Sequence, residues 1–371
     1  MDKVPFLEVG SAYSELRIEI DEALSRVLRS GRYILGEEVE KFEATWASYC
    51  EASFAVGVGN GLDALRIALA AAGVGPGDEV IVPAHTFIAT WLAVDSLGAT
   101  VVPAEPHEMT MNIDPSKIEA LITSRTKAIV PVHLYGQPAD LDPILEIAKA
   151  NKLLVVEDAA QAHGARYKGK RIGGHGDVVA WSFYPGKNLG AVGDAGAITT
   201  NNSDLADRAR LLGNYGSSEK YVHSIRGLNS RLDALQATVL NVKLQHLDAW
   251  NQRRSYVAEK YRRYIGERSG DKPLLVHQAV SEFSSPVWHL FVVRSGQRDA
   301  LKDFLGLRGI ETVSHYPTPA HRQPAFAKYE FPDMPITDRV SSQVLSLPLG
   351  PHLSESQAQR VLESLDFFVG A

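Results

Sequence analysis

Asp158 is one residue whose type and place in the sequence could do chemistry. It directly follows an apolar run, within residues 157–161. A carboxylate at the end of a strand could serve as a general base, a metal ligand or the partner of a cationic ring nitrogen. It could also be a helix N-cap, a place that Asp favours, and position alone supports the cap more strongly.

Lys187 is a second such residue, in a loop at 182–190 that contains glycine and proline. A lone loop lysine is usually a solvated surface charge. An amine that forms Schiff bases must be deprotonated part of the time, which requires a desolvated or cationic setting. A loop that returns over a parallel sheet could supply that setting.

Two glycine-rich stretches could bind phosphate. Residues 57–61 follow a predicted strand and open a helix, so their backbone N–H groups could cradle a phosphate, although a tight turn explains them about as well. Residues 164–170 match most of a P-loop, but Arg171 stands where Ser or Thr should bind magnesium. We interpret this second stretch as a surface turn and disfavour an NTPase. The histidines show no metal-ligand spacing, so we predict no catalytic metal.

Alternating elements must position these residues. Strands are predicted at 54–58, 79–82, 100–103, 127–132, 153–156, 178–182 and 196–200, and helices at 14–29, 37–49, 62–72, 88–96, 115–122 and 141–150. This alternation predicts an α/β fold with a mostly parallel, buried sheet covered by helices on both faces. Ligands bind beyond the carboxyl ends of such strands, which is where Asp158 and Lys187 stand.

The pattern changes after about Arg231. Residues 232–264 are predicted to be helical, and 269–273 form a connector. A smaller α+β unit follows, with strands predicted at 290–293 and 312–315 and a last helix at 355–367. Because a single core rarely serves 371 residues, we expect a large domain at 1–250 and a small one at 251–371.

Composition excludes several classes of protein. The net charge of -6 offers no basic surface for nucleic acid. Cys50 is the single cysteine, which excludes an intramolecular disulfide and a cysteine-rich zinc site. The start lacks a signal-peptide pattern, and the weakly polar stretch 80–94 is too short to span a bilayer. We therefore expect a cytoplasmic protein without nucleic-acid or membrane partners.

Several short segments occur in an order that resembles one known family. They are 30–36, 59–65, 83–90, 132–136, 157–165, 182–190, 227–233 and 315–317. Together they resemble the DegT/StrS nucleotide-sugar aminotransferases, which are fold-type I enzymes that use pyridoxal 5'-phosphate (PLP). The resemblance covers nearly the whole chain. It departs at Leu62, where many members have Thr, and at Ala195, where many have Gly.

The resemblance implies a role for each matching residue. It places PLP as a Schiff base on Lys187, with Asp158 facing the pyridine nitrogen. The other implied cofactor contacts are the N–H groups of Gly61 and Leu62 and the hydroxyl of Ser182 on the phosphate, Gln161 on the ring hydroxyl, Phe87 stacked on the ring, and Asn229 on the phosphate of the neighbouring subunit's cofactor. Asn229 thereby implies a homodimer with shared active sites.

The resemblance also implies a reaction, in which L-glutamate donates an amino group to a nucleotide-linked keto-deoxyhexose. The similar subgroup aminates carbon 3 of a dTDP-3-keto-6-deoxyhexose to give a dTDP-3-amino-3,6-dideoxyhexose, for lipopolysaccharide or glycoside biosynthesis. Amination at carbon 4 is the main competitor. The segments that border the sugar site contain Tyr184, Tyr215, Tyr316 and His321, and a purely structural role is an equal alternative for each.

Two other functions fit the same fold. A PLP-dependent sugar dehydratase of this family would carry His at the aldimine position, where this chain has Lys187. A non-enzymatic regulator that keeps the fold and ligand could tolerate losing Asp158 or Lys187, but both residues are present.

Overall fold

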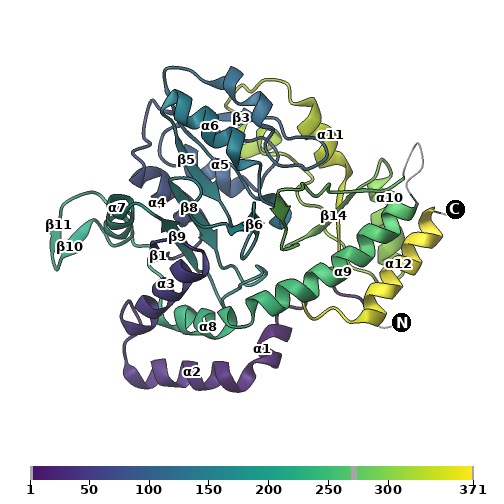
Figure 1. Cartoon of the computed structure of the whole chain (residues 1–371), viewed down its shortest axis with the longest axis horizontal. Helices are drawn as coiled ribbons and strands as arrows, with labels where there is room; N and C mark the ends of the chain where they lie inside the picture. Colours follow the sequence, from purple (N-terminus) through teal and green to yellow (C-terminus); the bar gives the residue numbers. More distant parts are fainter. Residues whose placement is uncertain (1–2, 269–273, 370–371) are drawn as a thin grey trace.

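The computed structural model describes residues 3–268 and 274–369. Within these residues a seven-stranded sheet forms the centre of the molecule, in the order β1-β9-β8-β5-β4-β2-β3 (Figure 1). The strands are β1 (Phe54–Val58), β2 (Glu79–Pro83), β3 (Thr100–Ala104), β4 (Thr126–Ile129), β5 (Leu154–Asp158), β8 (Val178–Ser182) and β9 (Gly196–Thr200).

The directions of these strands confirm the predicted α/β fold. The neighbours from β8 through β5, β4 and β2 to β3 are all parallel. Strand β9 runs antiparallel to both β1 and β8. Because β9 opposes both neighbours, β1 points the same way as the parallel strands, and their carboxyl ends share one edge.

Helices cover both faces of the sheet, as the alternating pattern predicts. One face packs against α4 (Gly61–Ala71), α5 (Ile88–Asp95) and α7 (Ser203–Gly213). The other packs against α3 (Glu37–Tyr49), α6 (Leu141–Asn151) and α8 (Ala234–Leu244). Along β8, Ala180 faces the first group whereas Val179 and Trp181 face the second, because successive side chains of a strand point to opposite faces.

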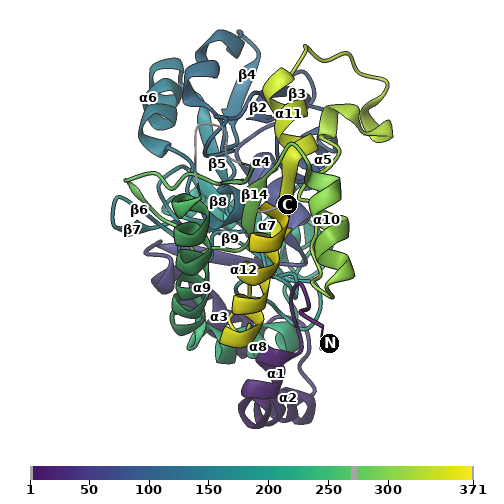
Figure 2. The ribbon, with the colours of Figure 1, turned by 90° about the vertical axis from the view of Figure 1, so that its right-hand side faces the viewer.

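A smaller unit follows α8, and the long helix α9 (Leu247–Glu267) leads to it (Figure 2). It contains the antiparallel strands β12 (Val276–His277), β14 (Phe291–Arg294) and β15 (Val344–Leu347), with α10 (Arg298–Leu307) and α12 (Glu355–Val369). Its own apolar core includes Val4 from the N-terminal segment. The predicted division at 250/251 falls inside α9 and remains a prediction.

Three predicted elements differ from the structure. The helix predicted at 14–29 is divided into α1 (Ser11–Glu15) and α2 (Arg17–Ser30), because the backbone at Leu16 leaves the helical region. Residues 115–122 form two short 3-10 turns instead of a helix. The segment 312–315 is not a strand, and Val313 makes a single bridge to β15 before the chain turns away toward two prolines that cannot donate hydrogen bonds.

Other elements were not predicted. They include α7, α10, β15 and α11 (Pro335–Gln343), and the hairpins β6 (Arg166–Tyr167) with β7 (Lys170–Arg171) and β10 (Ser217–Glu219) with β11 (Val222–His223); β13 (Ser284–Ser285) pairs with β6. The P-loop-like stretch is the β6–β7 hairpin, with Lys168 and Gly169 at positive φ, which confirms the predicted turn. The predicted connector at 269–273 lies outside the described residues.

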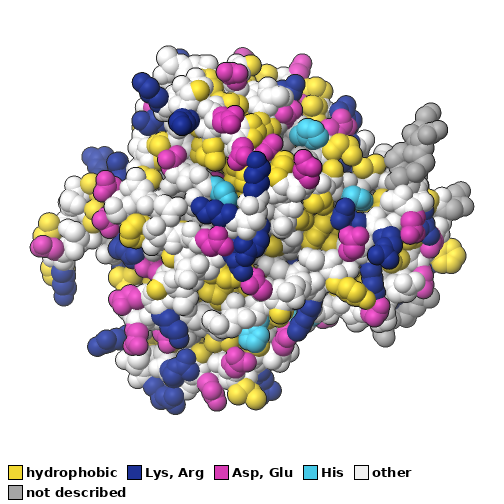
Figure 3. All heavy atoms as spheres, viewed as in Figure 1, with side chains coloured by type: hydrophobic (Ala, Val, Ile, Leu, Met, Phe, Trp, Pro, Cys, Tyr) yellow, Lys and Arg dark blue, Asp and Glu magenta, His cyan; other side chains and the backbone are white. Residues whose placement is uncertain are grey.

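The surface carries mixed charges, and the single cysteine is buried. Basic and acidic side chains are interspersed over the face that Figure 3 shows. Cys50 is 1% exposed, and burial raises the pKa of its thiol. Among the described residues, no helix has the length and apolar character needed to cross a membrane.

Candidate active site

Four of the predicted site residues lie at the same edge of the sheet. Asp158 ends β5 and Ser182 ends β8, while Gly61 opens α4 after β1 and Phe87 precedes α5 after β2. These strands all run in one direction, so their carboxyl ends meet at the edge where α/β sheets bind ligands.

Asp158 is buried at this edge, with 5% of its surface exposed. Its Oδ2 accepts a hydrogen bond of 2.9 Å from the Thr90 hydroxyl, and its Oδ1 accepts one of 3.2 Å from the Ala160 N–H. Burial raises the pKa of this carboxyl, while those two hydrogen bonds and the charge of Lys187 oppose the rise. A turn rather than a helix follows Asp158, so the helix-cap interpretation is wrong.

The loop that carries Lys187 is tied down just after the lysine. Asn188 donates a 2.9 Å hydrogen bond to the Asn251 side chain on α9. Further along, the buried ammonium of Lys243 on α8 donates a 2.7 Å hydrogen bond to the Gly190 carbonyl oxygen. The loop is therefore fixed by helices that lie more than fifty residues away in the sequence.

Lys187 itself is partly buried in this loop. Burial lowers the pKa of its amine to about 8, although the charge of Asp158 acts in the opposite direction. A neutral amine is thus available near neutral pH, as Schiff-base chemistry requires. The solvated surface charge that a lone loop lysine suggests does not describe this residue.

Gly61 lies so close to Ser182 that no side chain would fit between them. A Cβ on Gly61 would come within 2.5 Å of the Ser182 Cβ and 2.9 Å of its hydroxyl oxygen. The Asn60 side chain caps α4 at the N–H of Asp63, which leaves the N–H groups of Gly61 and Leu62 at the open start of the helix. Such a start, with a hydroxyl beside it, binds anions.

Gln161, Tyr316 and Phe87 form a connected group at the same edge. The Gln161 amide nitrogen donates a 3.0 Å hydrogen bond to the Tyr316 hydroxyl, and its carbonyl oxygen accepts one of 2.5 Å from the Tyr135 N–H. The rings of Phe87 and Tyr316 lie 5.3 Å apart between centroids. Phe87 remains 51% exposed, so its ring is free to contact a ligand.

These residues fit a PLP molecule. Among the described residues, no basic side chain forms an ion pair with the Asp158 carboxylate, and a protonated ring nitrogen would supply that counter-charge. The open start of α4 beside Ser182 fits a phosphate, and the amine of Lys187 is one that can be deprotonated. Each of the three features matches a different part of the same cofactor.

Other predicted residues lie on the outside of this edge. Asn229 is exposed and pairs through its backbone with Asn214. Tyr184 and Tyr215 are 59% and 47% exposed, and the guanidinium of Arg231 lies 5.4 Å from the centre of the Tyr215 ring. Within one copy of the chain, their side chains border open space.

His321 has a different setting. Its side chain is 4% exposed, and its Nε2 lies 3.1 Å from a carboxylate oxygen of Asp338 on α11. Burial lowers the pKa of the imidazole, and Asp338 opposes this effect. These contacts favour the structural role for His321 over the sugar contact.

The structure also identifies residues for which no role was predicted. Thr90 holds the Asp158 carboxylate, and Tyr135 holds Gln161. His163 contacts the Ser182 carbonyl oxygen through Nε2 at 2.9 Å. All three residues lie in segments that carry the family resemblance. Their roles could not be predicted because each depends on a hydrogen-bond partner elsewhere in the sequence.

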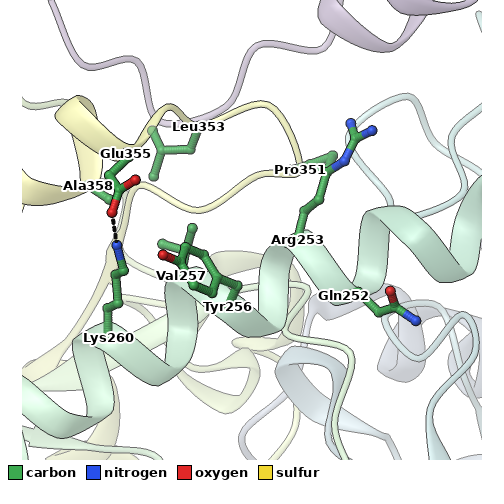
Figure 4. A pocket seen from close by; sticks show the side chains of 9 residues that line it. All are labelled: Gln252, Arg253, Tyr256, Val257, Lys260, Pro351, Leu353, Glu355 and Ala358. Carbon is green, nitrogen blue, oxygen red and sulfur yellow. Dashed lines mark hydrogen bonds and ion pairs between the residues drawn. The ribbon is translucent and has the colours of Figure 1, made fainter.

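A hollow of about 390 Å³ lies away from these strand ends (Figure 4). It is bordered by α9 and the segment that leads into α12, and an ion pair joins Lys260 to Glu355 across it. None of the predicted site residues lines it. The position of the chemical groups, rather than the size of a hollow, therefore identifies the candidate active site.

Comparison with known proteins supports the same conclusion. Residues 14–366 match the DegT/DnrJ/EryC1/StrS aminotransferase family, and the chain belongs to that family. The dTDP-3-amino-3,4,6-trideoxy-alpha-D-glucose transaminase of Streptomyces venezuelae is 53% identical over 98% of this chain and 95% of that protein. The dTDP-3-amino-3,6-dideoxy-alpha-D-galactopyranose transaminase of Aneurinibacillus thermoaerophilus is 49% identical over 98% of this chain and 99% of that protein.

Solved structures share the fold. The crystal structure of S. venezuelae DesV in complex with a ketimine intermediate matches with a TM-score of 0.97 and 52% identity, over 100% of both chains. NtdA from Bacillus subtilis, with bound cofactor PMP, matches with a TM-score of 0.93 and 35% identity, over 100% of this chain and 86% of that one. The fold of this chain is therefore one that holds a PLP-type cofactor in a relative.

Proposed function

We propose that this protein is a PLP-dependent aminotransferase that transfers an amino group from L-glutamate to carbon 3 of a dTDP-3-keto-6-deoxyhexose. The product is a dTDP-3-amino-3,6-dideoxyhexose. The observation that carries the proposal is the grouping of Asp158, Lys187 and the open start of α4 at one edge of the sheet.

Each of these groups has a distinct task in the proposed reaction. Bound PLP supplies a ring that accepts the electrons left on a substrate carbon when its proton is removed. The Lys187 amine holds the cofactor at rest, then takes the proton from the Cα of the amino donor as general base. The Asp158 carboxylate keeps the proton on the ring nitrogen, and Ser182 with the N–H groups of Gly61 and Leu62 holds the phosphate.

The electrostatics of the chain suit this task. A general base works best with a pKa near the operating pH, and burial brings the pKa of Lys187 to about 8. Thr90 and Ala160 favour the charged form of Asp158 by donating hydrogen bonds to it. A sugar dehydratase would not need an amine at position 187. A non-enzymatic regulator would need neither the Lys187 amine nor the Asp158 carboxylate.

The choice of carbon 3 rests on the named relatives. Two transaminases whose products carry nitrogen on carbon 3 of a dTDP-deoxyhexose share about half of their residues with this chain. In this proposal Tyr184, Tyr215 and Tyr316 would contact the sugar beyond the cofactor, and Phe87 would stack on the cofactor ring.

A homodimer with shared active sites is part of the proposal. Asn229 lies exposed on a loop, and its side chain makes no hydrogen bond to any other residue that the structure describes. In a dimer whose second copy faces this edge, Asn229 would contact the phosphate of the cofactor bound to that second copy.

Two experiments test the function. A PLP Schiff base on Lys187 should absorb at about 410 nm, and L-glutamate should bleach the band. A protein that stays colourless after incubation with PLP would contradict the proposed cofactor.

For the substrate, a panel of 3-keto and 4-keto dTDP- and UDP-sugars is tested, and NMR of the product should show an amine on carbon 3. An amine on carbon 4 would favour the 4-keto alternative, a deoxygenated product the dehydratase, and no turnover the regulator.

A further inference from the structure

A small cavity lies beside the loop that carries Lys187. It has a volume of about 30 Å³ and is bordered by residues 185–188 and 190 of the loop, residues 7–9 and 12 of the N-terminal segment, residues 351–352, and helices α8 and α9. That volume admits one or two water-sized particles and no amino acid or sugar. Lys187 is itself among the lining residues, so the cavity adjoins the candidate active site.

Two buried cations line this cavity. Lys243 on α8 is 4% exposed and Arg254 on α9 is 3% exposed. The Lys243 ammonium has three protons to donate, and it donates a hydrogen bond of 2.7 Å to the Gly190 carbonyl oxygen. Arg254 donates through Nη1 to three backbone carbonyl oxygens, while its Nε is buried without a hydrogen-bond partner.

The nearby carboxylates do not neutralise these charges. Glu8 lines the cavity but is exposed, and its carboxylate accepts a hydrogen bond from Ser11. Glu15 is bound by Arg253, the neighbour of Arg254 on α9. Within the described residues, no carboxylate lies within ion-pair distance of Lys243 or Arg254.

The contrast between the two adjacent arginines is informative. Arg253 points from α9 toward the outer hollow (Figure 4), and it has a carboxylate partner at 2.9 Å. Arg254 is buried, and its hydrogen bonds go to backbone carbonyl oxygens. Burial alone lowers the pKa of Lys243 to about 8 and that of Arg254 to about 10, with no anionic group raising either one.

Two buried cations without a counter-charge are energetically costly, and a bound anion removes much of that cost. We propose that the cavity binds one small inorganic anion, of the size and charge of chloride, between the Lys243 ammonium and the Arg254 guanidinium. The anion would hold Lys243 in its charged form and so maintain the hydrogen bond to Gly190. It is a structural ligand of the Lys187 loop and does not depend on the proposed transamination.

The first test measures the melting temperature of the holoenzyme in sodium chloride and in sodium gluconate at equal ionic strength. Gluconate is too large for the cavity. We expect chloride to raise the Tm by about 2 °C with a saturable dependence on concentration. Equal Tm values in the two salts at every concentration would overturn the proposal.

Variants locate the effect. Lys243→Met should abolish the difference between chloride and gluconate, and Lys243→Arg should keep it. Lys260→Met is the matched control, because Lys260 is on α9 but pairs with Glu355 outside the cavity, and it should respond to chloride as the native chain does. A chloride effect that survives in Lys243→Met would place the anion elsewhere and contradict the proposal.

A second measurement does not depend on any variant that folds poorly. Crystals of the native holoenzyme soaked in sodium bromide should show an anomalous peak within hydrogen-bond distance of the Lys243 ammonium and the Arg254 guanidinium. Water alone in the cavity, with bromide bound at other sites of the same crystal, would overturn the proposal.

Discussion

The inner and outer sides of the candidate active site are built very differently. On the inner side, Asp158 and Gln161 are buried and held by hydrogen bonds from Thr90 and Tyr135. On the outer side, Asn229 is exposed, and about half of the Tyr215 side chain is open to solvent. The inner side chains have hydrogen-bond partners within this chain, whereas these two outer side chains are open to solvent.

This difference separates two kinds of function. A side chain held by several neighbours is pre-organised, and such groups perform the chemical step with little reorganisation. Exposed aromatic and amide groups beside a site are typical of surfaces that meet a partner or a substrate. We therefore expect changes on the inner side to reduce turnover, and changes on the outer side to reduce binding or assembly.

The largest effect is expected at Lys187. Lys187→Ala removes the proposed general base and the amine proposed to hold the cofactor, so kcat for transamination should fall by about a thousandfold. Steady-state kinetics measure the loss, and circular dichroism checks that the fold is intact. Turnover at the native rate would show that another group is the base.

Asp158→Asn should have the next largest effect. The amide keeps the shape but loses the charge that faces the ring nitrogen, so kcat should fall about 10- to 100-fold, the value of a hydrogen bond to a charged group. The matched control is Asp177→Asn, because Asp177 accepts a hydrogen bond from Val155 at the opposite end of β5. Equal losses in both variants would indicate a general effect on the sheet.

Asn229→Asp tests the outer side. A negative charge next to the partner's cofactor phosphate should weaken PLP binding by about tenfold, measured by titration of the apoprotein. At a PLP concentration too low to fill the sites of Asn229→Asp alone, mixing this variant with Lys187→Ala should restore activity to about a quarter of the native value, because half of the sites in each mixed dimer regain both native residues. No recovery after confirmed subunit exchange would contradict shared sites.

The smallest expected effect concerns pH. The Lys187 pKa of about 8 lies below the ordinary value for lysine, so the neutral amine accumulates as the pH rises through 8. The rate at which apoprotein recombines with PLP should rise about fivefold between pH 7 and pH 8 and then level off. A rate that keeps rising steeply above pH 9 would show that the amine is solvated.

Much of the sheet could be predicted because its strands are short apolar runs between clear turns. Residues 54–58, 178–182 and 196–200 were predicted with the bounds that the structure has. The antiparallel direction of β9 could not be predicted, since an apolar run carries no direction. The predicted strand at 312–315 was wrong, because its composition favours a strand but its neighbours in space allow one bridge.

The candidate site was predictable in its residues but not in its setting. Asp158 and Lys187 stand at strand ends that the sequence marks. Their burial depends on groups from distant segments: Thr90 for Asp158, and Asn251 and Lys243 for the Lys187 loop. No local sequence pattern links these residues to Asp158 or Lys187. From the sequence alone, Asp158 therefore suggests a helix cap and Lys187 a surface charge, and only the folded chain shows that Asp158 is buried and Lys187 partly buried.

The single buried thiol gives the experimenter a clean background for labelling. Cys50 is the only cysteine and is almost fully covered. Tyr221, at the turn of the β10–β11 hairpin that projects from the body (Figure 1), is 83% exposed. A cysteine placed there by Tyr221→Cys would be the one readily reactive thiol, so a donor dye on one batch and an acceptor dye on another would report subunit exchange by fluorescence without any further mutation.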